Sequence, residues 1–163
     1  MNSSQIIGTF RYFWASDATL QTYMEATSRD DALKHILAKD ASYISLKDGY
    51  KYPGLAIRMV DDYDDVLIPS NNEFLEVLII NDVKKTDSLL TVYNIKDRIK
   101  EMTIDRINGH AKLDNLNAQG QSLGFDTKIR GVFWVSASPY DEKEQGSERL
   151  QRLICLMRLI VGD

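Results

Sequence analysis

The feature that most constrains this fold is an apolar run at residues 148–163, with the sequence ERLQRLICLMRLIVGD. Its alternate residues are apolar on both sides of an extended chain: Leu153, Cys155, Met157, Leu159 and Val161 on one side, and Ile154, Leu156 and Ile160 on the other. As a strand, the run would be covered on both faces of a sheet. It also fits a helix, through a spacing of three and four at Leu150, Leu153, Ile154, Met157 and Ile160. The pattern leaves strand and helix open, and in either form the run belongs to the core.

Length and composition are those of one globular domain. The chain has 163 residues, of which 44% are hydrophobic and 27% charged. We expect a single α+β domain over residues 1–163. No stretch approaches the roughly 18 consecutive apolar residues of a membrane span, and the first residues lack a basic leader followed by an apolar segment. We therefore expect neither membrane insertion nor secretion.

The charge argues against a nucleic-acid-binding protein, and the cysteine count excludes a fold held by internal disulfides. The net charge is −4, and the basic residues are dispersed, which argues against a protein that binds nucleic acid by neutralising phosphates. The single cysteine, Cys155, cannot form an internal disulfide, so packing must stabilise the fold. Its position within the apolar run predicts a buried thiol and not a reactive one.

Helical periodicity occurs in three places. Apolar residues between Ile6 and Met24 predict one or two helices, which we interpret as an N-terminal helical extension over residues 1–28. A capping serine at position 28, followed by acids, predicts a helix over 29–39. The clearest helix is expected over 88–102, capped by Asp87 or Ser88, with its buried stripe at Leu89, Val92, Ile95, Ile99 and Met102.

Strand-like segments complete the pattern. They lie at residues 52–60, 74–80 and 128–137, and the last of these would pair with the closing apolar run. The Gly- and Asn-rich residues 105–127 predict a long loop. The order of elements predicts an α+β fold, a mostly antiparallel sheet with helices packed on one face.

One motif resembles a catalytic one. Residues 120–124 read GQSLG and match the G-x-S-x-G elbow of hydrolases. That elbow needs a strand before the serine and a helix after it, whereas a polar segment precedes Ser122 and a predicted strand follows. A hydrolase histidine also comes after its serine, but His35 and His110 both come before Ser122. We interpret the motif as part of a flexible loop and expect no catalytic residues.

We also expect no cofactor and no metal. The phosphate-binding patterns GxxxxGK[ST] and GxGxxG are absent from the sequence. His35 is expected on a helix flank or at the surface, and His110 has no nearby Cys or His that would complete a zinc site.

Two charged segments are candidates for contact with partners. The first is acidic and comprises Asp61, Asp62, Asp64 and Asp65. Its spacing lacks the pattern of a calcium loop, so it is either a solvated loop or a lining that keeps a passing polyanion from binding. The second is predicted to be the exposed tip of a hairpin and comprises Asp141, Glu142, Lys143 and Glu144. Projecting loops of this kind often carry partner surfaces.

The layout resembles a known family. The stretches that carry the resemblance are ALKHIL at 32–37, YPGLAIR at 52–58, EFLEVLII at 73–80 with the helix over 88–102, and a terminal strand rich in Arg and apolar residues. Together they resemble the tail-terminator and related neck, or head–tail joining, proteins of tailed bacteriophages. The resemblance extends over about residues 29–163, in layout and texture and without an invariant motif.

The resemblance implies a structural protein of virion assembly, which caps the tail tube and joins it to the head connector. Implied partners are further copies of the chain in a hexameric ring, the tail tube protein and the connector or neck proteins. DNA would pass through the lumen without specific binding, and the implied location is the virion, after assembly in the host cytoplasm. The two charged segments and the loop would face the lumen, the tube or the connector. The residues themselves leave an alternative, a small non-enzymatic protein-binding adaptor module outside viruses.

Overall fold

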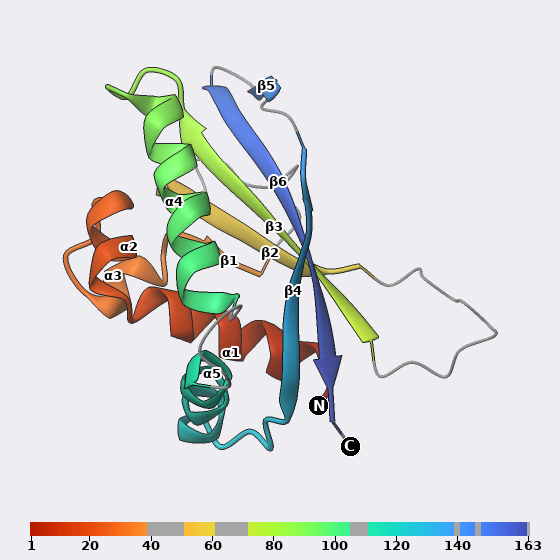
Figure 1. Cartoon of the computed structure of the whole chain (residues 1–163). Helices are drawn as coiled ribbons and strands as arrows, with labels where there is room; N and C mark the ends of the chain where they lie inside the picture. Colours follow the sequence, from red (N-terminus) through yellow and green to blue (C-terminus); the bar gives the residue numbers. More distant parts are fainter. Residues whose placement is uncertain (39–50, 61–71, 105–110, 139–140, 146–147, 163) are drawn as a thin grey trace.

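The computed structural model describes residues 1–38, 51–60, 72–104, 111–138, 141–145 and 148–162 (Figure 1). In chain order the elements are α1 (Ser3–Ala15), α2 (Ala18–Tyr23), α3 (Arg29–Ala32), β1 (Ile36–Leu37), β2 (Gly54–Met59), β3 (Asn72–Asp82), α4 (Ser88–Thr103), α5 (Ala111–Ser122), β4 (Ile129–Ala137), β5 (Asp141–Gln145) and β6 (Glu148–Val161).

The described strands form one sheet in the order β1-β2-β3-β6-β4, and β5 pairs with β6 beside that path. The pair β1 and β2 is parallel, and the other pairs are antiparallel. The predicted α+β class with a mostly antiparallel sheet is therefore confirmed. The strands predicted over 52–60, 74–80 and 128–137 correspond to β2, β3 and β4.

The apolar run is the strand β6, not a helix, and it lies between β3 and β4. Its residues pair with β3 from Leu150, opposite Asp82, to Ile160, opposite Asn72. On its other side it pairs with β4, as the sequence predicted. The predicted burial on both faces holds only in part. On the helix side, the side chains at 153, 155, 157, 159 and 161 are buried. On the other side, Leu150 is buried in a second apolar cluster with Leu78 and Ile80, whereas the side chains at 154, 156, 158 and 160 are half-buried.

The main core joins the helices to one face of this sheet. Its apolar cluster contains Phe10 and Trp14 of α1 and Ile95 of α4, together with strand residues such as Val77 and Met157. Figure 1 shows α1, α4 and α5 on the same side of the sheet. Burying a large apolar side chain stabilises the fold by about 1.5–3 kcal/mol, so this cluster is the main source of stability.

The helices predicted near the N-terminus are confirmed, and they belong to this core instead of forming an extension. A capping box between Asn2 and Gln5 starts α1. One turn apart, the rings of Phe10 and Trp14 contact each other with centroids 5.2 Å apart, and both side chains are fully buried. The indole Nε1 of Trp14 donates a hydrogen bond of 3.0 Å to Thr103 Oγ1 at the end of α4.

Helix α3 is shorter than the predicted 29–39. Ser28 caps it as expected, but the helix ends at Ala32. Beyond it, the guanidinium of Arg11 donates to the carbonyl oxygens of Leu33, at 2.8 Å, and Ile36, at 2.6 Å. Ile36 then pairs with β2 as the start of β1. Hydrogen bonding to α1 and to the sheet therefore replaces the last two turns of the expected helix.

The predicted loop over 105–127 is wrong for residues 111–122, which form α5, while residues 105–110 lie outside the described part. The Asn117 side chain accepts a bond of 2.9 Å from the Ile129 N–H and donates one of 2.8 Å to the Ile129 carbonyl, which joins α5 to the start of β4. At Gly120 the helix approaches α1 closely. A Cβ atom there would lie 2.0 Å from Thr127 Cγ2 and 2.7 Å from Thr9 Oγ1.

Candidate interaction surface

Helix α4 has two different faces. Its buried face carries Val92, Ile95, Ile99 and Thr103. Its exposed face carries Leu90, Tyr93, Asp97 and Glu101, which follow the helical spacing i, i+3, i+7 and i+11 and which we call the α4 stripe. Leu89, beside the stripe, is 38% exposed, so its predicted burial was wrong. Leu89, Leu90 and Tyr93 together form a group of exposed apolar side chains on one helix.

Polar contacts fix the position of α4 at both ends. Asp87 occupies the N-cap position but makes no capping side-chain bond; instead the Ser88 hydroxyl donates to the Gln151 side chain of β6. Farther along, two nitrogens of Arg98 donate to the carboxylate of Asp17, at 2.7 and 3.0 Å. Burial would raise the pKa of Asp17, but these bonds and the Leu20 N–H outweigh it and hold the pKa below 3.8. The α4 stripe is thus displayed on a rigid support.

A second exposed apolar group lies on β4, at the edge of the described sheet. Phe133 and Val135 are 43% and 48% exposed. Toward the start of this strand, Lys128 and Arg130 are exposed and basic. We call these four residues the β4 surface. The register against β6 shifts between 129 and 131 and again between 134 and 136, which is typical of the bulges that shape a sheet edge.

Cations lie over the aromatic rings on both faces of β4. The Lys100 ammonium of α4 lies 4.7 Å from the centroid of the Trp134 ring, and the Arg158 guanidinium of β6 lies 4.8 Å from that of Phe133. These cation–π contacts hold the two rings in place at the sheet edge. The edge therefore combines fixed aromatic rings with positive charge.

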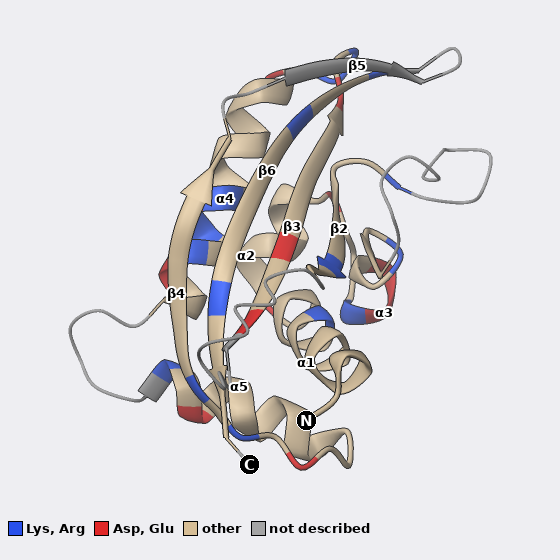
Figure 2. Cartoon of the chain, turned by 90° about the vertical axis from the view of Figure 1, so that its right-hand side faces the viewer, with Lys and Arg blue, Asp and Glu red and all other residues tan. Residues whose placement is uncertain are grey.

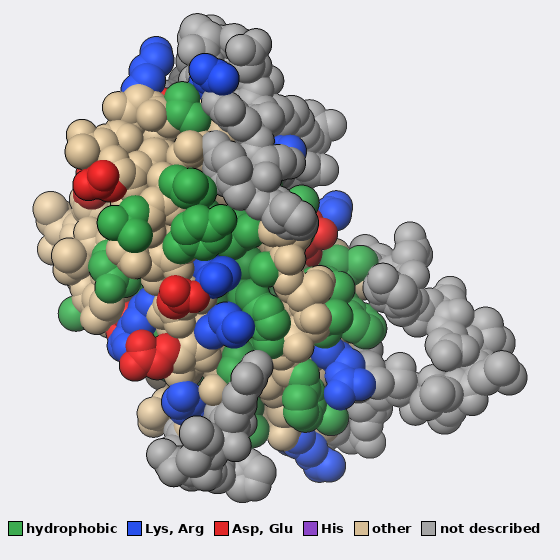
Figure 3. All heavy atoms as spheres, turned by 45° about the horizontal axis from the view of Figure 1, so that its top comes forward, with side chains coloured by type: hydrophobic (Ala, Val, Ile, Leu, Met, Phe, Trp, Pro, Cys, Tyr) green, Lys and Arg blue, Asp and Glu red, His purple; other side chains and the backbone are tan. Residues whose placement is uncertain are grey.

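The sheet face opposite the helices carries a smaller buried apolar cluster, which includes Ala56, Leu78 and Ile80, beside charged residues. Arg58 of β2 and Glu76 of β3 stand opposite each other and form a two-point ion pair, with distances of 2.7 and 3.1 Å. Figure 2, which looks onto this face, shows acidic positions on β3 and basic ones on β6. The space-filling view, turned so that the top of Figure 1 comes forward, shows hydrophobic side chains among charged ones (Figure 3).

The two predicted charged segments stay untested as contact surfaces. Asp61, Asp62, Asp64 and Asp65 lie outside the described residues. Residues 141–145 form the strand β5, which pairs with β6, so their placement at a hairpin tip was wrong. The side chains of Asp141, Glu142, Lys143 and Glu144 lie outside the described part. Both remain predictions as contact residues.

The serine of the GQSLG motif is not arranged for nucleophilic attack. Ser122 ends α5, and its hydroxyl donates to the carbonyl oxygen of Gln119 at 2.6 Å. It lines an open depression of about 430 Å³ together with Phe13, Asp17 and Met102. The motif lies at the end of α5, which corrects its interpretation as part of a flexible loop, and not in a strand–turn–helix elbow.

His35 and Cys155, the other residues considered for chemistry, are both buried in the fold. His35 is 2% exposed, which corrects its expected place at the surface, and its Nδ1 lies 2.6 Å from the Pro53 carbonyl oxygen. Burial lowers the pKa of His35. Cys155 is buried as predicted, and burial raises the pKa of its thiol to about 12, so it has little thiolate character at neutral pH.

The sequence analysis missed the α4 stripe. The signal was available, since Leu90 and Tyr93 add apolar residues outside the buried stripe of a helix that needs none there. Among the described residues, no cluster of His, Cys, Asp and Glu could hold a metal ion, and no helix is both long and apolar enough to cross a membrane. Comparison with protein-family models and with curated proteins finds no match for this chain.

Proposed function

We propose that this chain is a structural, non-enzymatic subunit that joins copies of itself in a closed ring, as the tail terminator or neck protein of a tailed bacteriophage. One observation carries the proposal. In the described part, the exposed large hydrophobic side chains fall into two groups on different elements: Leu89, Leu90 and Tyr93 on α4, and Phe133 and Val135 on β4.

Two unlike surfaces are what a ring requires. In a head-to-tail assembly each subunit presents one surface to the neighbour before it and a different surface to the neighbour after it. Single exposed apolar residues are common on protein surfaces, whereas grouped ones indicate contact with a partner. The rigid attachment of α4 to the core through Arg98 and Asp17 supports this role, because a ring needs subunits of fixed shape.

The layout of the sequence supports the finer parts of the proposal. Its stretches at 52–58 and 73–80 now lie on β2 and β3, next to each other in the sheet. The proposed partners are the tail tube protein and the head connector or neck proteins, with six copies in the ring and DNA passing through its lumen. The proposed location is the virion.

The test is the state of assembly of the purified protein. Native mass spectrometry over a concentration series, with negative-stain electron microscopy, should give one closed oligomer with rotational symmetry. The series is repeated with the tail tube protein of the same genome added, because a ring can assemble on its partner. A chain that stays monomeric in both series would overturn the proposal.

A further inference from the structure

We propose that the α4 stripe of one copy packs along the β4 surface of the next copy, apolar end against apolar end and acid against base. This inference rests on the proposed ring and identifies its contact. The two surfaces are the stripe of Leu90, Tyr93, Asp97 and Glu101, and the surface of Lys128, Arg130, Phe133 and Val135.

The α4 stripe changes character along its length. Its N-terminal half is apolar, with Leu90 58% and Tyr93 37% exposed. Its C-terminal half is acidic, and the side chains of Asp97 and Glu101 are 69% and 70% exposed. A partner that matches it must be apolar at one end and basic at the other.

The β4 surface has that pattern. Lys128 and Arg130 put positive charge at the start of the strand, and Phe133 and Val135 put apolar surface toward its end. The Arg158 guanidinium over Phe133 adds positive charge beside the ring. Opposed charges of this kind fix the register and orientation of two proteins.

The lengths also agree. From Leu90 to Glu101 is eleven residues of helix, or about 16 Å at a rise of 1.5 Å per residue. On the β4 surface, the part from Arg130 to Val135 covers five residues of strand, or about 16 Å at a rise of 3.3 Å per residue, and Lys128 lies two residues before it. The apolar and the charged ends of both surfaces can therefore meet at once.

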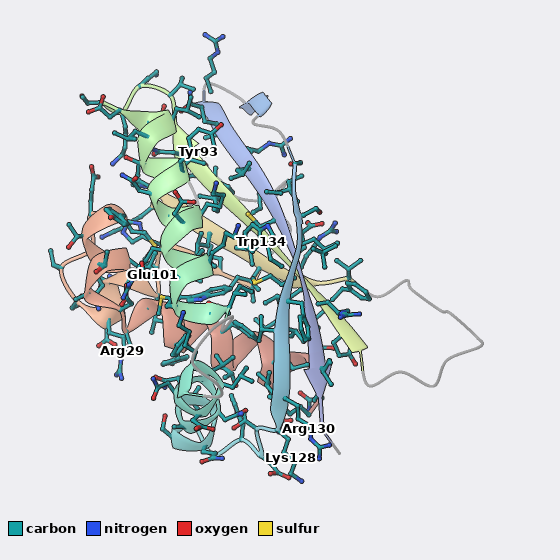
Figure 4. The ribbon with its side chains drawn as sticks, viewed as in Figure 1. Arg29, Tyr93, Glu101, Lys128, Arg130 and Trp134 are labelled. Atoms are coloured by element: carbon teal, nitrogen blue, oxygen red, sulfur yellow. The ribbon has the colours of Figure 1, made fainter. Side chains whose placement is uncertain are left out.

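A single copy cannot make this contact with itself. Figure 4 shows Glu101 on the α4 side of the molecule and Lys128 and Arg130 at the start of β4, away from it. Because β4 is the last strand in the described order of the sheet, a neighbouring copy can approach it from outside. When two unlike surfaces on different sides of a subunit meet, one of each stays open to a further copy, as a head-to-tail ring requires.

The charged ends have local partners that they can exchange. Asp97 lies 3.1 Å from Lys96, Glu101 lies 3.3 Å from Arg98, and Lys128 lies 3.1 Å from Asp126. Each of these pairs includes a side chain at least 69% exposed, and exposed pairs contribute little to stability. Arg130 takes part in none of the ion pairs within the described part of the chain. It is the basic residue best placed to accept a new carboxylate.

A charge swap tests the contact. Glu101→Lys and Arg130→Glu should each weaken self-association by about tenfold or more, because each places like charges opposite each other, and the double variant should restore it. Native mass spectrometry in dilute salt measures the oligomer, and a thermal melt checks that each variant folds. Asp30→Lys, on α3, makes the same charge change at an acid whose side chain is 85% exposed and should leave assembly unchanged.

The outcomes separate this contact from the ring itself. A wild-type ring that persists in both single variants would leave the proposed function standing and overturn the contact. The contact also fails if both single variants weaken the ring but the double variant does not restore it. A wild-type chain that never assembles, alone or with the tube protein, would overturn the proposed function and the contact together.

Discussion

Helices α1 and α4 both pack on the sheet, but they use their large side chains differently. In α1 the side chains of Ile6, Phe10 and Trp14 are at most 1% exposed. Helix α4 buries its own apolar stripe just as well, yet leaves Leu90 58% exposed. The large side chains of α1 serve the fold, whereas α4 carries apolar surface that its packing on the sheet does not require.

The difference separates residues of the fold from candidate residues of function. A mutation in α1 should act on stability, and a mutation in the α4 stripe should act on assembly. The three changes below test that division, and they run from the largest expected effect on stability to the smallest.

The first change removes the largest side chain that α1 buries. Trp14→Ala should lower the free energy of unfolding by about 3–5 kcal/mol, through the cavity and the lost bond to Thr103 Oγ1. Leu90→Ser, on α4, should change it by less than about 0.5 kcal/mol. Chemical denaturation below the concentration of assembly measures both. Equal losses of unfolding free energy in the two variants would show that Leu90 stabilises the fold as much as Trp14 does.

The second change tests how closely α5 packs at Gly120, against Thr127 and against Thr9 of α1. Gly120→Ala adds a Cβ atom 2.0 Å from Thr127 Cγ2, and we expect a loss of about 1–3 kcal/mol from overpacking. At an open helical site the same change would stabilise the protein by about 1 kcal/mol, so the sign is decisive. The control is Gly8→Ala, where the nearest atom is Cε2 of the Phe125 ring at 3.0 Å. That ring can move, so the control should cost less.

The third change loosens α4 from α2. Arg98→Ala removes both hydrogen bonds to Asp17 and should cost about 1–2 kcal/mol at pH 7. Because the folded state lowers the pKa of Asp17, this stability is present above pH 3.8 and is lost as pH falls through the folded pKa. The melting temperatures of wild type and variant should therefore converge in acid.

A matched variant checks that interpretation. Asp17→Asn removes the charge but keeps a side-chain oxygen that can accept from the Leu20 N–H, so the cap of α2 is retained. This variant should be less stable than wild type at pH 7. Its stability should also lack the part of the wild-type pH dependence that comes from the titration of Asp17. If the difference in stability between wild type and Asp17→Asn stays constant down to pH 3, the Asp17 and Arg98 pair contributes nothing through its charge.

Much of the fold could be predicted from the sequence, because its strands and α4 follow their periodicities closely. Helix α5 could not. Poor helix formers such as Asn115, Asn117 and Gly120 interrupt its sequence, and tertiary contacts hold it in place. Asn117 bonds to the start of β4, and Gly120 allows the close approach to α1. Neither contact can be predicted from a single sequence, because each joins residues that only the folded chain brings together.

The candidate site was predictable only in part. Exposed charge was expected at Asp61 and at Glu142, which are the kind of residue that a loop carries. The α4 stripe is mixed, and although its apolar residues lie outside the predicted buried stripe, the sequence alone does not show whether they are covered. Whether Leu90 faces the core or the solvent depends on how the helix is rotated against β3 and β6, which only the assembled sheet determines.

The position of β6 affects how the protein can be made. It is the last of the strands along the chain, yet it separates β3 from β4 in the sheet. During translation, the β3 and β4 edges that it joins stay open until residues 148–161 have left the ribosome. Pairing over such long sequence separations is slow, so the newly made chain passes through a stage in which two apolar edges are exposed to aggregation.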